Sequence, residues 1–64
     1  MKKLIGLRAM VQVDGLTCSL EGKIIATGDD LIMIDARAIE NGKATPIDGR
    51  VLIPRHRVVW VQVP

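Results

Sequence analysis

The sequence is poor in cysteine and in aromatic residues. Among its 64 residues Cys18 is the only cysteine, Trp60 the only aromatic residue and His56 the only histidine. A single cysteine forms no internal disulfide, and one cysteine with one histidine does not complete a zinc site. A core without phenylalanine or tyrosine must be built from Val, Ile, Leu, Met and Ala, which argues against a catalytic cleft with aromatic walls. We therefore expect neither a metal nor another cofactor.

Long apolar runs are also missing. No stretch approaches the length that a membrane-spanning helix needs. The N-terminal MKKLIGLRAM begins like a signal peptide, but Arg8 interrupts its apolar part early and no small-residue cleavage site follows. We expect a cytoplasmic protein without a membrane partner.

Catalytic patterns are absent as well. No glycine-rich phosphate loop precedes a helix, and no nucleophile has a base beside it in the sequence. Cys18 lies on a predicted strand flanked by apolar residues and is interpreted as a small buried hydrophobic residue rather than a nucleophile. The chain is not expected to be an enzyme.

The charge is small and uneven. The formal net charge is +2. From residue 43 onward the chain carries Lys43, Arg50, Arg55 and Arg57 against Asp48 alone. This asymmetry places a weakly basic side in the C-terminal third.

A chain of this length forms one domain, residues 1–64, with a small core. Such a domain buries roughly 60% of the surface that its unfolded chain exposes, so the monomer is marginally stable. Disulfides and metals are excluded as ways to stabilise so small a domain. Self-association is the way that remains.

Short strands separated by turns account for most of the chain. Residues 8–13 alternate, with Ala9, Val11 and Val13 on one side, and then meet Asp14-Gly15, which is typical of a hairpin. Residues 16–30 follow as a second strand, in which Gly22 indicates a bend or bulge. The remaining stretches are a third strand over 31–39, a loop or poorly paired hairpin tip over 40–49, and two last strands over 50–54 and 57–63.

Five strands and no long helical period predict an all-β fold: a small, open, five-stranded SH3-like barrel with little or no N-terminal helix. One alternative stays open. Residues 29–42 also fit a helix, with Asp29 or Asp30 as N-cap and Gly42 just past its end.

Two stretches carry a family resemblance. LEGKIIATGDDLIMID, residues 20–35, resembles the first motif of the Sm-like family, and GRVLIPRHRVVWVQVP, residues 49–64, resembles the second. The resemblance covers about residues 13–64. The basic turn is most similar to the Hfq branch, whose lysine-histidine pair falls on Arg55 and His56.

The resemblance implies a Sm-like barrel that forms a ring of about six or seven copies, in which the fourth strand of one subunit pairs with the fifth of the next. It also implies single-stranded RNA as the partner, bound at the pore-side turns by Asp29, Asp30, Leu31, Arg55 and His56. Leu31 stands where Hfq has a base-stacking aromatic residue. Because leucine lacks a π-face, a place in the core is the alternative for this side chain.

Plainer interpretations remain for the other residues. Arg55 and His56 also fit a solvated turn, and Asp29 and Asp30 also fit simple turn formers. Trp60 is expected in the core or at a subunit interface, with a nucleic-acid platform as the less favoured role. The competing function is a structural or protein-interaction barrel, for example in a phage-type assembly, that does not bind RNA.

Overall fold

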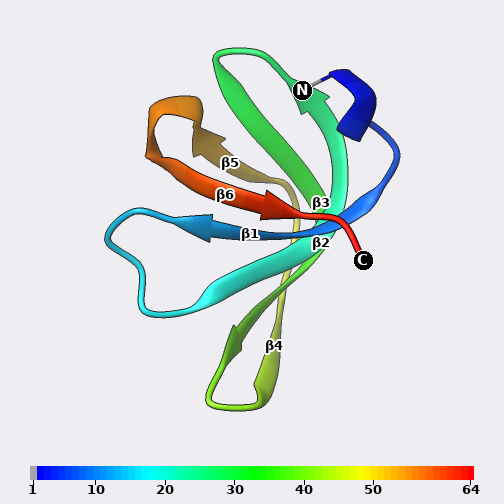
Figure 1. The fold of residues 1–64 in the computed structure, drawn as a ribbon. Coiled ribbons are helices and arrows are strands. Elements are labelled where there is room, and N and C mark those ends of the chain that lie inside the picture. Colours follow the sequence, from blue (N-terminus) through cyan, green and yellow to red (C-terminus); the bar gives the residue numbers. More distant parts are fainter. Residues whose placement is uncertain (1) are drawn as a thin grey trace.

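The structure is a computed structural model that describes residues 2–64. Six strands form one antiparallel sheet in the order β4-β3-β2-β1-β6, with β5 paired to β3. The elements are two 3-10 turns, η1 (Lys2–Leu4) and η2 (Arg55–Arg57), and the strands β1 (Arg8–Val13), β2 (Ser19–Thr27), β3 (Asp30–Glu40), β4 (Lys43–Ile47), β5 (Val51–Pro54) and β6 (Val58–Gln62). Figure 1 shows the sheet curling on itself. The all-β prediction is confirmed, and η1 is the only helical turn before β1 in the described residues.

The helix alternative for residues 29–42 is wrong. Residues 30–40 form β3, the longest strand, which pairs with β2 on one side and with β4 and β5 on the other. Its side chains alternate at the start, with Leu31 and Met33 buried and Asp30, Ile32 and Ile34 half-buried. That period of two is the pattern of a strand and leaves no helical stripe.

Of the two interpretations of residues 40–49, the loop is wrong and the hairpin tip is correct, although its strands pair regularly rather than poorly. Asn41 and Gly42 have positive φ values, 52° and 79°, which is the conformation of a tight two-residue hairpin turn. They join β3 to β4, and β4 pairs in regular register with residues 36–40. Pro46 is tolerated because β4 is an edge strand. Since β4 and β5 pair with the two halves of β3, the structure has six strands where five were expected.

The sheet bends at Gly22, as its position in the sequence predicts. The β2–β3 register shifts between Glu21 and Lys23. A Cβ atom built on Gly22 would lie 2.9 Å from the Cα of Ala36 and 3.0 Å from the carbonyl oxygen of Ile34. Only glycine fits where the two backbones approach this closely. The bend lets the two ends of the sheet enclose a core.

The core lies on the inner face of the curved sheet and is entirely apolar. It contains Ala9, Val11, Val13, Leu20, Ile24, Leu31, Met33, Ala36 and Ile53. The predicted inward face of the first strand is confirmed by three of these residues. Cys18 is half-buried and packs at the margin of this core, so it is less buried than expected. Trp60 is 43% exposed, and the expectation that it belongs to the core of one chain is wrong.

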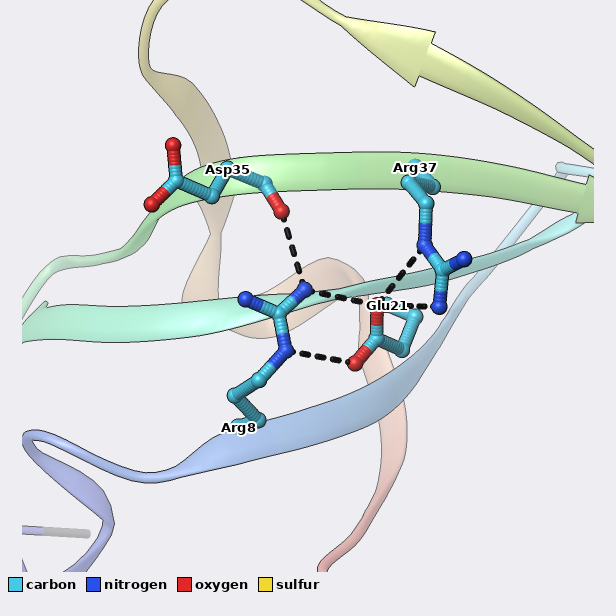
Figure 2. A network of polar contacts seen from close by, with 4 residues as sticks. All are labelled: Arg8, Glu21, Asp35 and Arg37. Atoms are coloured by element: carbon cyan, nitrogen blue, oxygen red, sulfur yellow. Dashed lines mark hydrogen bonds and ion pairs between the residues drawn. The ribbon is translucent and has the colours of Figure 1, made fainter.

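The outer face of the sheet carries an ion-pair network that joins three strands across the bend (Figure 2). The Glu21 carboxylate accepts hydrogen bonds from Arg8 on β1, at 2.8 and 2.9 Å, and from Arg37 on β3, at 3.1 and 3.2 Å. Arg8 also donates to the carbonyl oxygen of Asp35, at 3.0 Å. Asp35 has a positive φ of 50°, so this bond supports the irregular part of β3.

The network makes the stability of the folded chain depend on pH in the acidic range. The hydrogen bond from Arg8, reinforced by Arg37 and opposed by burial, lowers the pKa of Glu21 from 4.5 to about 2. A carboxyl group with a lowered pKa in the folded state stabilises the protein above its unfolded pKa and loses that effect as the pH falls. We expect the melting temperature to fall between pH 4.5 and about 2, where Glu21 becomes protonated.

A Glu21→Gln variant should lack this contribution, so its melting temperature should change less with pH over that interval. Glu40→Gln is the matched control, because Glu40 is an exposed glutamate on the same sheet whose carboxylate bonds only to the Thr17 hydroxyl among residues 2–64. Equal acid sensitivity in the parent and in Glu21→Gln would contradict the assignment.

No helix in residues 2–64 has the length and hydropathy to cross a membrane.

Candidate functional site

The basic turn predicted from the sequence is a single 3-10 turn, η2, between β5 and β6. Arg55, His56 and Arg57 are all exposed. The turn is anchored at both ends, because Ile53 before it is buried and Val58 after it packs against the core. The chain therefore holds three cationic or potentially cationic side chains outward on a short, anchored support.

The β2–β3 turn lies directly against η2. The backbone N–H of Arg55 donates a 2.9 Å hydrogen bond to the carbonyl oxygen of Asp29. Asp30 is the cross-strand partner of Pro54. The structure thus brings together two pairs of residues that the sequence placed in separate motifs: Asp29 with Asp30, and Arg55 with His56.

The β1–β2 loop supports η2 from the other side. The N–H of Asp14 donates a 2.7 Å hydrogen bond to the carbonyl oxygen of Arg57. The Arg57 guanidinium reaches toward Gly15, where a built Cβ would lie 3.8 Å from Nη2. Figure 1 shows η2 between these two loops. In the sequence Asp14-Gly15 indicates only a hairpin, and Arg57 is not among the predicted site residues, because the contact between these loops arises from the curvature of the sheet.

Arginines and carboxylates share this end of the molecule without pairing. Both ion pairs in residues 2–64 involve Glu21, so Arg55 and Arg57 form none there. An arginine that is not already paired can direct its planar donor fork at a phosphate or carboxylate. The described residues contain no group of three His, Cys, Asp or Glu side chains that would hold a metal ion.

Leu31 does not share the exposure of its neighbours. Its side chain is 1% exposed and lies opposite Ile53, also buried, in the β3–β5 ladder. The core interpretation therefore holds for this residue. Its side chain cannot act as a platform for a base, and the candidate surface consists of Asp29, Asp30, Arg55, His56 and the added Arg57.

Two free strand edges flank the candidate surface. Within residues 2–64, β5 pairs only with β3, and β6 pairs only with β1. Large apolar side chains are exposed on both strands: Leu52 at 54% on β5, and Val59 at 59% with Trp60 at 43% on β6. Unpaired backbone groups beside apolar side chains form a template for pairing with another strand.

A cavity of about 310 Å³ lies away from η2, at the β3–β4 hairpin. Its lining residues are Cys18, Ala38, Glu40, Asn41, Lys43 and Thr45. None of the candidate residues around η2 lines this cavity.

No family model and no curated protein matches the chain. Solved structures do. The SmAP1 heptamer of P. aerophilum matches with a TM-score of 0.84 and 17% identity, over 98% of this chain and 85% of that one. The Sm protein of Pyrococcus abyssii in complex with a uridine heptamer matches with a TM-score of 0.83 and 15% identity, over 98% of this chain and 90% of that one. A chain of the NatC complex bound to CoA matches with a TM-score of 0.83 and 18% identity, over 98% of this chain and 82% of that one.

Proposed function

We propose that this chain, which has the Sm-like fold, assembles into a closed ring of about six or seven copies and binds single-stranded RNA at the turns that face the pore. The observation that carries the proposal is the hydrogen bond between Arg55 and Asp29, which joins the two turns implicated by the sequence into one surface. The likeness to a Sm protein in complex with a uridine heptamer supports RNA as the ligand.

The chemistry of this surface suits a single strand. Arg55 and Arg57 supply donor forks for phosphate oxygens, which position a nucleic acid without reading its sequence. The carboxylates of Asp29 and Asp30 accept hydrogen bonds, so they suit the N–H groups on the edge of an unpaired base. His56 adds a donor or acceptor between the two kinds of contact.

The unpaired edges of β5 and β6 provide a physical reason for the ring to form. Pairing β5 of one copy with β6 of the next satisfies both unpaired edges and covers Leu52, Val59 and Trp60. Such a contact is head-to-tail, so it is repeated around the assembly until the ring closes. Closure sets one η2 turn from each copy around a common axis, which concentrates weak single-copy charges. The match to the SmAP1 heptamer of P. aerophilum supports this arrangement.

The mass of the native particle tests the proposal. We expect a particle of about six or seven copies of the 7.0 kDa chain, and a further rise in mass on adding a short uridine oligonucleotide. Native mass spectrometry measures both in one experiment. A folded monomer at micromolar concentration would contradict the ring, and a ring whose mass stays unchanged with oligonucleotide would contradict RNA binding.

A protein-interaction role is the second candidate. The NatC match places a chain of this fold inside a protein complex, and the free edges here would pair with a strand of another protein equally well. The salt dependence of binding distinguishes the two roles. RNA binding through arginines weakens steeply as salt rises, whereas pairing through strand edges and apolar surface does not.

A further inference from the structure

The Arg8–Glu21–Arg37 network presents its positive side to solvent. The three side chains lie on the outer face of the sheet, because each directly follows or precedes a core residue along its strand. The side chains of Arg8 and Arg37 are 47% and 49% exposed, whereas that of Glu21 is 16% exposed. The two guanidiniums therefore cover the carboxylate that they share. An approaching molecule meets two cations and little of the anion between them.

Both guanidiniums keep donors for a further partner. Arg8 and Arg37 bond to their acceptors through Nε and Nη2, and the hydrogen bonds among residues 2–64 leave Nη1 of each arginine unused. Figure 2 shows these two Nη1 atoms pointing to opposite sides, away from Glu21. The bonds to Glu21 hold both groups in place, so little side-chain entropy is lost when a ligand binds.

The surroundings of the network favour an anion. Lys23, which is exposed, is the cross-strand partner of Arg8 on the same face. Asp35 is the other carboxylate nearby, and Figure 2 shows its side chain turned away from the Arg8 guanidinium, which contacts only its carbonyl oxygen. This face thus carries three cations, Arg8, Arg37 and Lys23, against the two carboxylates of Glu21 and Asp35, which leaves an excess of one positive charge.

We propose that this outer face is a second nucleic-acid site, separate from η2, in which Arg8 and Arg37 bind phosphates of the sugar-phosphate backbone. Two donors that point in opposite directions cannot close on one phosphate ion, but they fit two phosphates of one chain. The contacts reach only phosphates, so the site does not distinguish sequences. The choice of nucleic acid among polyanions rests on the proposed function; the anion site itself rests on the network.

The test removes one guanidinium while the other stays paired. In Arg37→Gln the bidentate pair of Arg8 and Glu21 remains, so the fold is expected to persist, which circular dichroism and the melting temperature check. Arg50→Gln is the matched control, because Arg50 is exposed in the β4–β5 turn and lies outside the network. Both changes are made in a background carrying Arg55→Ala and His56→Ala, which removes the two η2 side chains assigned by the sequence.

The probes are uridine strands of about six and about thirty nucleotides, chosen against single-strand site sizes of about 4–16 nucleotides. In this background we expect the long strand to retain salt-dependent binding. Arg37→Gln should weaken that binding several-fold and lower the slope of log affinity against log salt by about one for each phosphate that is no longer bound. Arg50→Gln should leave both unchanged.

The outcomes separate the two proposals. Loss of all long-strand binding in the background variant, or equal binding by Arg37→Gln and Arg50→Gln, overturns the outer-face site. Binding of phosphatidylserine vesicles that depends on Arg37, without binding of the long strand, also overturns it in favour of a membrane surface. If the parent protein does not bind the short uridine strand but binds the long one, and this binding depends on Arg37, the outer-face site stands and the pore proposal fails.

Discussion

A Gly22→Ala variant is expected to lose about 1–3 kcal/mol of its free energy of unfolding, the usual cost of forcing an extra methyl group into a packed place. The new Cβ would meet the Cα of Ala36 at 2.9 Å and the carbonyl oxygen of Ile34 at 3.0 Å. Both obstacles are backbone atoms, so no side-chain rotation relieves the contact. The variant must open the β2–β3 pair at the bend that shapes the barrel.

That loss is large for this chain. Stabilities of about 0.05–0.15 kcal/mol per residue give a domain of this length only a few kcal/mol in all. Each kcal/mol lowers the melting temperature of a small domain by about 4–8 °C, which thermal unfolding followed by circular dichroism resolves.

Gly28→Ala is the matched control for Gly22→Ala. A Cβ at Gly28 would meet no atom within 4 Å, and its φ lies outside the positive range. This variant should be neutral or slightly stabilising, because alanine restricts the unfolded chain more than glycine does. If both variants melt at the parent's temperature, the close approach at Gly22 does not hold the bend.

The strands that the sequence predicted correctly are those whose pattern is local. Val11 and Val13 alternate with polar residues, and a glycine inside a run of strand-forming residues indicated the bend at Gly22. The β4 strand escaped prediction because residues 43–47 are mostly exposed and carry Pro46 at the sheet edge, so no apolar alternation marks them. The core alternative for Trp60 was wrong because an exposed strand edge and a buried strand can have the same apolar sequence, and its interface alternative stays a prediction.

The candidate site likewise has parts that a local sequence pattern predicts and parts that depend on tertiary contacts. The turn at Arg55 and the turn at Asp29 were each predictable from proline, glycine and aspartate in short stretches. Their contact, and the support from Asp14, depend on which loops the curved sheet brings together, and this is a tertiary property. Arg8 and Arg37 went unnoticed for a similar reason, since Glu21 joins them across three strands and no short spacing reports it.

Replacing Arg55 and His56 together with alanine is expected to abolish most of the affinity for a short uridine-rich strand while the proposed ring stays assembled. Neither side chain is buried, and the strands on both sides of η2 are held by Ile53 and Val58. The loss should be many-fold, because the symmetry of the proposed ring repeats the change in every copy. The slope of log affinity against log salt should fall by about one for each phosphate that the variant no longer binds. Fluorescence anisotropy over a range of salt concentrations measures both quantities.

Arg50→Ala provides the control for this double variant. It removes the same formal charge at neutral pH, from an exposed position in the β4–β5 turn outside η2. If binding depended only on net charge, the two variants would lose affinity equally, whereas a site built on η2 predicts a large loss in the double variant alone. A double variant that binds as tightly as the parent would contradict the pore site and leave the exposed turn as solvated surface. Pairing of the β5 and β6 edges with another protein would then be the better account of the chain.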